Sequence, residues 1–554
     1  MAHGVYLAPA PALALGDPDR PLSVTALATL AHAPAAPATE PRLALHPVAA
    51  ARVDHAAAIV QEIVESHRVV YGINTGFGAF KDRVIPLADL TRLQANLITS
   101  QTVGVGPPLA REEVRALMIA RAQTLSLGYS GLRQSTLQLL IAMINCGVHP
   151  VIPQQGSVGA SGDLAPLSHM AQVMTGGGEA EYGGVTLPAR QALQAAGLEP
   201  VTLIAKEGLA ICNGTSQISG LLALATHDAT ILTLAADICG ALSFEALEGI
   251  VDALDPRIHA ARGQTGQIAA SAHLRALIAG SELVWHGGSR LDGVDAAGTG
   301  AAPPVAHKVQ DAYALRCMAQ VHGPARDTLA FVRGIVEIEL NAAVDNPLIF
   351  GAGVVGYEDG PAVISGGNFH GMPVAVAADV LGIPFCAVAS ISERRQARLV
   401  DIHAHGGLLP PFLIADGGLN SGFMMVQYSA AALVSENKSL AHPASVDSIP
   451  TSANQEDHVS MGPIAARHAR AILRNTQLVL AMELLTAGQA IDLRRLAAGR
   501  PLRLGRGTQV AYALLREQVP YRTADAPFTA DIAWADELIR SGRLVREVAA
   551  ALAE

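Results

Sequence analysis

The residues of this sequence that are most suggestive of chemistry lie in a glycine- and serine-rich run at residues 156–167, which reads GSVGASGDLAPL. The run places Ala160, Ser161 and Gly162 in succession, which combines a minimal side chain, a hydroxyl and a freely bending backbone. A flexible turn before a helix capped by Asp163 is the simplest interpretation of an isolated string of this kind. A phosphate-binding loop is a second interpretation, but the lysine of the G-x-x-x-x-G-K-[ST] pattern is missing. A third interpretation, in which the three residues react with one another, depends on the rest of the sequence.

Further strings of glycine, amide, aromatic and charged residues are spread widely along the chain. They are YGINTGFG at 71–78, LAICNGT at 209–215, VQDAYALRC at 309–317, DNP at 345–347, SGGNFH at 365–370 and SANQEDH at 452–458. Together with residues 156–167, and in this order, they resemble the signature strings of the histidine and phenylalanine ammonia-lyases. The resemblance extends over nearly the whole chain, from about residue 71 to beyond residue 462. The sequence is therefore identified as a member of this family.

The resemblance implies a cofactor that the chain makes from itself. In the family, the Ala-Ser-Gly segment cyclises and loses water to give the electrophile methylidene-imidazolone (MIO), here from Ala160-Ser161-Gly162. The Gly162 nitrogen must reach the carbonyl carbon of Ala160, which only a tightly bent backbone with minimal side chains permits. Ser161 supplies the hydroxyl whose loss leaves an exocyclic methylene. The Asp163 side chain or nearby helix termini could assist the dehydration.

Elimination must also remove a β-hydrogen that is barely acidic. By resemblance the base is Tyr71, the first residue of the YGINTGFG string. An ordinary tyrosine has a pKa of about 10, so Tyr71 needs a site that favours the phenolate, such as helix N-termini or a nearby cation. A core tyrosine followed by a turn would be the simpler interpretation if the other strings were absent.

Several residues are predicted to hold the substrate. Arg316 resembles the residue that grips the substrate carboxylate, which a guanidinium does bidentately. Gln310, Tyr313 and Arg316 recur every three residues, so one helix face or turn could direct all three into one site. By resemblance, Gln310 and Asn213 hold the MIO oxygen or polar groups of the substrate, and Tyr313 lies near the MIO and assists its formation or proton transfer. Phe369 packs beside the ring system, with ordinary core packing as the alternative.

The choice of amino acid depends on the residues facing the substrate ring. Glu456 matches the acid that lies near the imidazole in histidine ammonia-lyases, and a carboxylate facing a benzene ring would be uncompensated. One departure is the pair Ser100-Gln101, where histidine-specific members read Ser-His, because glutamine cannot titrate as histidine does. We predict elimination of ammonia from L-histidine to give trans-urocanate. A tyrosine or phenylalanine ammonia-lyase, or an MIO aminomutase, remains the alternative, and an inactive structural homologue is less favoured.

The elements that must position these residues are mainly helices. Apolar spacing predicts helices at about 53–64, 87–101, 111–127, 132–145 and 206–254, from 309 and 369 onward, at 422–441 and around 472–483, with short strands only near Val151 and Val185. The Pro- and Ala-rich residues 1–41 are expected to be partly flexible, and residues 287–304 to form a surface loop. We predict a mainly α fold: residues 42–554 form one lyase region, whose smaller N-terminal MIO-bearing part of helices and loops ends at about 205 and precedes a long central helical bundle.

Composition restricts the partners of this fold. The net charge is −10 and no run of Lys or Arg occurs, so nucleic acid is an unfavoured partner. Residues 208–226 lack charges but hold too many polar groups for a membrane span, and no secretory leader is recognised. Five scattered cysteines favour a reducing, cytoplasmic setting, and the DIHAH string at 401–405 lacks the further ligands of a metal site.

The apolar content also bears on assembly. Half of the residues are apolar and the mean hydropathy is +0.32, which favours an oligomer that buries helix faces against copies of itself. The resemblance implies a homotetramer whose active sites are built from more than one subunit, with a small-molecule amino acid as substrate.

Overall fold

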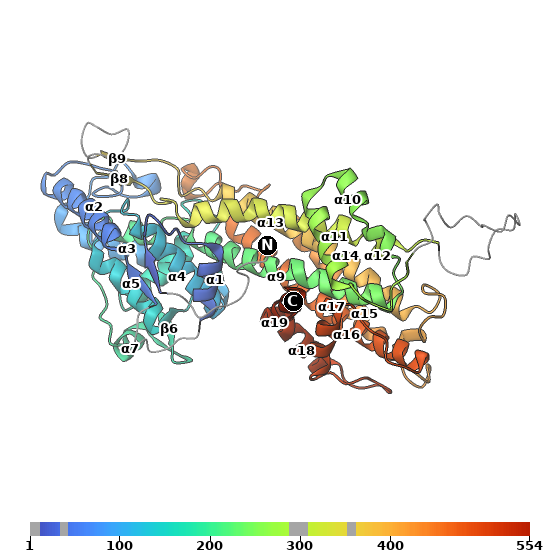
Figure 1. Ribbon diagram of the computed structural model, residues 1–554. Helices are drawn as coiled ribbons and strands as arrows, with labels where there is room; N and C mark the ends of the chain where they lie inside the picture. Colours follow the sequence, from blue (N-terminus) through green and yellow to red (C-terminus); the bar gives the residue numbers. More distant parts are fainter. Residues whose placement is uncertain (1–11, 34–41, 287–308, 352–361, 554) are drawn as a thin grey trace, which may run out of the picture.

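The structure of the chain is a computed structural model that describes residues 12–33, 42–286, 309–351 and 362–553. The mainly α fold predicted from the sequence is confirmed, because helices dominate the described residues and the strands are short. Figure 1 shows long helices running along the molecule, with the N-terminal helices gathered at one end of them.

A bundle of long helices forms the centre of the molecule. It consists of α9 (Ser216–Ala246), α13 (Met318–Leu340), α14 (Met372–Val400), α15 (Met424–Leu440) and α16 (Gly462–Ala498). At about 1.5 Å per residue, the 37 residues of α16 extend for about 55 Å. Both α9 and α14 are long and apolar enough to cross a membrane by composition, but the apolar window of α9 is 83% buried inside the protein. A helix that is apolar all round and packed on every side is a core helix.

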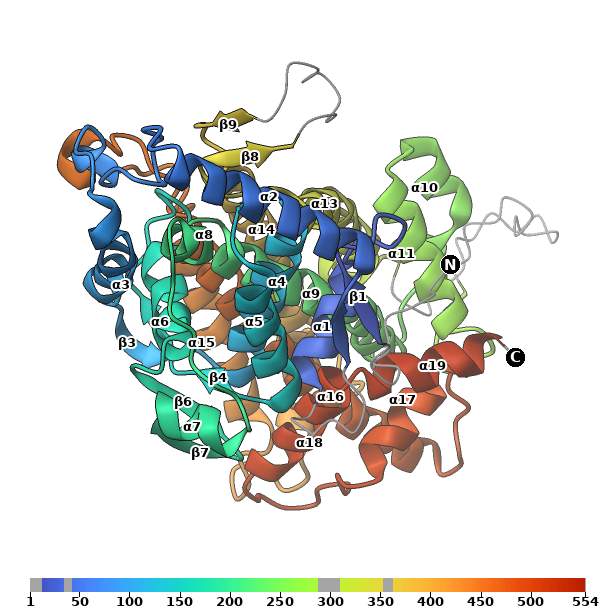
Figure 2. The same cartoon turned by 90° about the vertical axis from the view of Figure 1, so that its left-hand side faces the viewer.

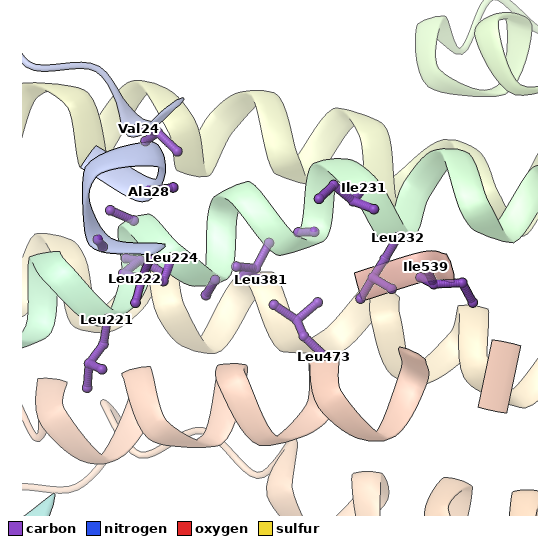
Figure 3. Close-up of a cluster of buried hydrophobic side chains, with 14 of the residues drawn as sticks. Val24, Ala28, Leu221, Leu222, Leu224, Ile231, Leu232, Leu381, Leu473 and Ile539 are labelled. Carbon is purple, nitrogen blue, oxygen red and sulfur yellow. The ribbon is translucent and has the colours of Figure 1, made fainter. Parts of the chain in front are cut away.

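The apolar core lies where α9 meets its neighbours (Figure 3). Leu221, Leu224 and Leu232 of α9 are fully buried or nearly so, and they belong to one cluster with Leu381 of α14 and Leu473 of α16. The bundle also encloses charge. Arg395 of α14 binds Glu483 of α16 through Nε–Oε1 at 2.5 Å and Nη2–Oε2 at 2.8 Å, with neither side chain exposed.

The N-terminal region consists of shorter helices that surround the start of the bundle (Figure 2). They are α2 (Pro47–Glu65), η1 (Gly78–Phe80), η2 (Leu87–Asp89), α3 (Leu90–Gln101), α4 (Arg111–Ser126), α5 (Gln134–Cys146), α6 (Leu164–Met174), α7 (Ala189–Ala195) and α8 (Glu207–Cys212). The opposite end and the C-terminal part hold η3 (Val251–Leu254), α10 (Pro256–Arg262), α11 (Thr265–Leu277), α12 (Tyr313–Arg316), η5 (Pro411–Leu413), α17 (Arg506–Arg516), α18 (Thr529–Arg540) and α19 (Arg543–Ala553). The short helix η6 (Ser452–Asn454) instead contacts η1 of the N-terminal region.

Within the described parts of the chain, four small sheets join loops rather than building a layer. One sheet pairs β1 (Leu13–Leu15) in parallel with β2 (Leu43–Leu45). The other sheets are antiparallel: β3 (Val105–Pro108) pairs with β5 (Pro153–Gln155), and β8 (Leu348–Phe350) pairs with β9 (Ala362–Ile364). In the three-stranded sheet, β6 (Glu179–Tyr182) lies between β4 (His149–Pro150) and β7 (Val185–Pro188). The strand predicted near Val185 is present. Near Val151 the chain instead forms two short strands, one on each side of that residue.

Two expectations from the sequence differ from the structure. Residues 12–33, part of the segment expected to be partly flexible, form β1 and α1 (Val24–His32), and α1 buries Val24 and Leu27 against the bundle. The continuous helix expected over 206–254 is divided into α8 and α9 at residues 213–215, because Gly214 adopts a φ of +144° that a helix does not allow. The loop predicted at 287–304 lies outside the described residues.

Candidate active site

A cavity of about 690 Å³ opens between the N-terminal region and the start of the bundle. Its wall combines segments that are hundreds of residues apart in the sequence. Seven of the residues predicted for the site line it: Tyr71, Gln101, Ala160, Ser161, Asn213, Phe369 and Glu456. The structure therefore brings most of the predicted strings to one place, while the roles of these residues stay predictions.

The Ala-Ser-Gly segment forms a tight bend in the wall of this cavity. Gly162 has a φ of +68° and pairs with Gly214, whose carbonyl oxygen accepts from the Asp163 nitrogen at 2.7 Å and whose nitrogen donates to the Ser161 oxygen at 3.3 Å. A Cβ on Gly162 would lie 2.2 Å from the Gly214 oxygen, so only glycine fits this position. The backbone around Gly162 is thus bent and held on both sides, as ring closure requires.

Asp163 does not cap the helix that follows it, contrary to the simplest interpretation of the sequence. Its side chain makes no cap bond to α6, and Oδ2 instead accepts from the backbone nitrogens of Gln217 at 2.8 Å and Ile218 at 3.0 Å, in the first turn of α9. Ser157 Oγ donates to Oδ1 at 3.2 Å. Burial raises the pKa of Asp163 to about 7, even though these hydrogen bonds act to lower it.

Three long helices begin close to this bend. Ile218 lies in the first turn of α9, and a Cβ built on Gly371, just before α14, or on Gly462, the first residue of α16, would lie within 2.7 Å of its Cδ1 atom. Ser460, just before α16, donates from Oγ to the Gly159 oxygen at 3.2 Å. A helix N-terminus carries partial positive charge, so the convergence of three of them favours negative charge developing at this wall.

Tyr71 lines the cavity but does not have the environment that the sequence led us to expect. Burial raises the pKa of Tyr71, the backbone hydrogen bond with Gly78 lowers it, and the Glu456 carboxylate raises it further. The sequence argument required a cation or helix N-termini that favour the phenolate. Within one chain, the net effect of the described surroundings is the opposite.

Glu456 is held by a strained turn. Thr451 and Glu456 pair across the turn, with Thr451 N donating to the Glu456 oxygen at 2.9 Å, and Thr451 Oγ1 donates to Glu456 Oε2 at 2.9 Å. Ser452, Ala453 and Asn454 between them all have positive φ values, which are costly for residues other than glycine. The free carboxylate oxygen, Oε1, lies 3.3 Å from Ser161 Oγ, which donates to it. The acid is therefore aimed at the bend from which the MIO would form.

The predicted pair on α3 is divided between the cavity and the surface. Gln101 lines the cavity, and its Oε1 accepts from Ser168 Oγ at 3.2 Å. Ser100 is exposed, does not line the cavity, and donates from Oγ to the Leu97 oxygen at 3.0 Å. Successive helix residues point about 100° apart, so only one residue of the pair faces the cavity.

Asn213 sits at the end of α8. Its Nδ2 donates to the Asn346 oxygen at 3.1 Å, whereas its Oδ1 is buried with no hydrogen-bond partner among the described residues. Because a buried polar atom without a partner is costly, this oxygen is available to a polar group that enters the cavity.

Gln310, Tyr313 and Arg316 lie elsewhere on the chain. Tyr313 and Arg316 share the short helix α12, with the guanidinium carbon 4.5 Å from the tyrosine ring centroid, and Tyr313 is 69% exposed. Gln310 lines a separate cavity of about 540 Å³ beside Arg398 and His405. In Figure 1, α12 lies at the end of the molecule opposite to α3. A single chain therefore does not bring these three residues to the cavity that holds Tyr71.

Comparison with known proteins shows to which family the chain belongs. The sequence profile described as aromatic amino acid lyase matches residues 26–517, which is most of the chain. The chain belongs to the aromatic amino acid lyase family. A histidine ammonia-lyase from Chloroflexus aurantiacus is 48% identical to this lyase over 527 residues, which cover 95% of the lyase and 97% of that protein.

Solved structures share the fold along the full length of the lyase. A histidine ammonia-lyase from Trypanosoma cruzi has a TM-score of 0.83 and 40% identity, and the match covers 96% of the lyase and 94% of that chain. A tyrosine aminomutase from Streptomyces globisporus has a TM-score of 0.87 and 35% identity, covering 97% and 98%. The family assignment made from the sequence strings is confirmed.

Some residues of the lyase that line or support the cavity were not predicted. Lys81 and Gln455 line it, and Lys81 Nζ donates to Gln455 Oε1 at 2.7 Å, which joins the loop after Tyr71 to the segment of Glu456. Thr451 supports Glu456 from the preceding turn. Gln455 lies within the signature string at 452–458 and Lys81 follows the string at 71–78 by three residues, and these positions were the only signal in the sequence. Their pairing depends on two segments that are 374 residues apart.

Proposed function

We propose that this lyase eliminates ammonia from L-histidine to give trans-urocanate. The observation that carries the proposal is that Ser161, Tyr71 and Glu456 line one cavity, with the Glu456 carboxylate hydrogen-bonded to Ser161. A carboxylate in this position complements the N–H of an imidazole and is uncompensated opposite a benzene ring. The relatives from Chloroflexus aurantiacus and Trypanosoma cruzi carry the name histidine ammonia-lyase, which supports the same substrate.

We infer that the cofactor is an MIO formed from Ala160-Ser161-Gly162. The bend at Gly162, its close approach to Gly214 and the helix N-termini around it fit such a ring, because they leave no room for a side chain and favour developing negative charge. Once formed, the ring supplies an electron-poor carbon that takes up the substrate amine.

The side chains of the cavity perform the remaining tasks. The Tyr71 oxygen, as phenolate, takes the β-proton of the substrate. Glu456 accepts a hydrogen bond from the imidazole, and the unpartnered Asn213 Oδ1 accepts one from a donor of the substrate or the ring. Phe369 lines the cavity beside them and excludes water, which strengthens each of these electrostatic contacts.

We further propose that the carboxylate grip comes from another copy of the chain in a homotetramer. Tyr313 of α12 is exposed and the half-buried Arg316 lies over its ring, and apolar residues of the bundle are exposed, including Ile338 of α13 at 73%. Exposed apolar surface of this kind is typical of an interface. The arrival of an arginine beside Tyr71 would also supply the cation that the single chain lacks, and would lower the pKa of Tyr71. We place the assembly in the cytoplasm, where the five free cysteines would stay reduced.

Two measurements test the reaction. Each elimination product conjugates an alkene with the ring, so absorbance after addition of histidine, tyrosine or phenylalanine in turn identifies the substrate. An increase with tyrosine and none with histidine would overturn the histidine proposal. The intact mass of the folded protein should be lower than the sequence mass by two water molecules, and Ser161→Ala should abolish that deficit of two waters together with turnover.

Complementation tests the shared site. Tyr71→Phe and Arg316→Ala are each expected to inactivate the enzyme. When the two variants are assembled together, some sites combine an intact Tyr71 with an intact Arg316, so part of the activity should return. If the mixed assembly stays as inactive as each variant, the carboxylate grip does not come from a second copy.

A further inference from the structure

A buried arginine lies directly behind the bend that holds Gly162. Arg121 belongs to α4 and its side chain is 0% exposed. Its Nη2 donates to the carbonyl oxygen of Ala210 in α8, close to the C-terminal end of that helix, where a cation is favourable. Among the described residues, its Nε and Nη1 have no hydrogen-bond partner. A buried cation with so few partners is costly, so a local reason for its presence is required.

Arg121 contacts the backbone of Gly214, which in turn pairs with Gly162. A Cβ on Gly214 would lie 2.3 Å from Arg121 Nη1, so the guanidinium abuts the backbone of Gly214. The same glycine binds the oxygen of Ser161 and the nitrogen of Asp163, on the two sides of Gly162. Arg121, Gly214 and Gly162 therefore lie one behind another. Val344, whose Cγ2 atom would lie 3.0 Å from the same Cβ, confines Gly214 further.

We propose that Arg121 is a positioning residue for closure of the MIO ring. Its planar guanidinium is held rigidly behind Gly214 and keeps Gly214 pressed against Gly162. The inference rests on the proposed MIO chemistry. Arg121 touches no reacting atom and acts only through Gly214. The planar guanidinium is fixed at Ala210 and buried on all sides, so it cannot retreat when the peptide is compressed.

Ring closure needs this compression because two groups of one chain must approach more closely than an amide prefers. The Gly162 nitrogen forms a bond to the Ala160 carbonyl carbon, and its proton passes to the carbonyl oxygen. That oxygen leaves as water with the proton of the Ser161 nitrogen. The Ser161 hydroxyl then leaves as a second water with the Ser161 α-hydrogen, which gives the exocyclic alkene. No oxidant or reductant is needed, and the only by-products are two waters.

Arg121 has no direct ion pair among the described residues, and nearby acidic groups act on it at a distance. The carboxylates of Asp345 and Asp163 both act on Arg121, and Asp345 is already bound by Lys206 at 2.7 Å. Burial lowers the pKa of Arg121 and these carboxylates raise it. The cation is thus retained by nearby charge while its planar group stays free to pack on Gly214.

The experiment follows ring formation itself. The full-length chain is made by cell-free synthesis, and its intact mass is recorded over time for the wild type, Arg121→Lys and Gly214→Ala. Lysine at position 121 keeps the charge but lacks the planar guanidinium. The Cβ of alanine at position 214 forces the Arg121 guanidinium away from the backbone of residue 214. A displacement of about 1 Å slows a positioned reaction about 100-fold, so the loss of two waters should be about 10- to 100-fold slower in both variants.

Arg115→Lys is the matched control. Arg115 lies on the same helix and is also buried, but it donates to the carbonyl oxygens of Leu30 and Ile144, on a side away from Gly214. It should form the ring at the wild-type rate. Circular dichroism and gel filtration establish that each variant folds, and Gly214→Ala carries the test if Arg121→Lys does not fold.

The outcomes separate this inference from the proposed function. If the wild type never loses two waters, the proposed MIO chemistry fails. If the wild type does, and Arg121→Lys and Gly214→Ala fold and lose them at the wild-type rate, the role of Arg121 is refuted. A slowing shared equally by Arg115→Lys would also refute it, because the effect would then come from general destabilisation.

Discussion

Replacing Glu456 by glutamine tests how the cavity selects an imidazole. The carboxylate accepts from Thr451 Oγ1 at 2.9 Å and directs its other oxygen into the cavity. Glutamine preserves the size but removes the charge. A hydrogen bond to a charged group contributes about 1.5–3 kcal/mol, so kcat/KM for histidine should fall about 10- to 150-fold. For phenylalanine the change removes an uncompensated charge, and kcat/KM should stay constant or rise.

The assay measures kcat/KM from the absorbance of each product, with Glu456→Gln and the wild type at matched MIO content. Thr451→Val is the control, because it keeps the carboxylate and removes only its hydroxyl partner. Loss of a neutral hydrogen bond of about 0.5–1.5 kcal/mol predicts a fall of about 2- to 12-fold. An unchanged ratio of histidine to phenylalanine activity in Glu456→Gln would refute the idea that the carboxylate reads the imidazole.

Three further results are expected. A base acts in its deprotonated form, so kcat/KM should rise with pH through the pKa of Tyr71, which burial and Glu456 raise and the arginine of the proposed neighbouring subunit lowers. Glu483→Gln leaves the buried Arg395 uncompensated and should lower the free energy of unfolding by about 3–5 kcal/mol in chemical denaturation. Lys81→Met removes the exposed contact with Gln455 and should raise KM by less than about 10-fold, with the MIO content unchanged.

Each of these expectations has its own control. The alkaline limb of the pH profile should move to lower pH in Glu456→Gln, because one cause of the raised pKa of Tyr71 is removed, and a limb that does not move contradicts the assigned base. Asp255→Asn keeps a side chain that can cap α10, removes only the charge that pairs with the exposed Arg257, and should leave stability nearly unchanged. Lys81→Arg should behave as the wild type, and a large loss of kcat in Lys81→Met would mean that the lysine acts in the chemistry itself.

Much of the fold followed from local patterns. The apolar spacing at 111–127 and 422–441 predicted α4 and α15 almost to the residue, because helical spacing is a local pattern that a few turns of sequence display. The break at Gly214 escaped prediction, since it depends on a close approach to Gly162 rather than on the local sequence. The packing of α1 escaped for a similar reason, because its partners lie far along the chain.

The site was predictable where the signature strings themselves form the wall. Tyr71, Ser161 and Glu456 line one cavity, whereas Ser100 does not, because the direction of a side chain on α3 depends on how the helix packs and not on the two residue types alone. Arg121 was not predicted either, since an arginine within a helical pattern ordinarily faces solvent. Its significance depends on burial and on the contact with Gly214, and both arise only in the folded chain.

Tyr71 and Arg316 lie far apart on one chain, so formation of the MIO and catalytic turnover should differ in whether they require assembly. Every group named around the bend at Gly162, from Gly214 to Asp163, belongs to one polypeptide, so on the proposed function an isolated subunit has what it needs to form the MIO. In the proposed homotetramer, the residues that would hold the substrate carboxylate come from a neighbouring subunit, because α12 lies at the end of the chain's fold opposite to α3. Dilution to separate subunits should therefore abolish activity while the MIO stays intact. Concentrating the same protein again should restore activity without synthesis of new protein.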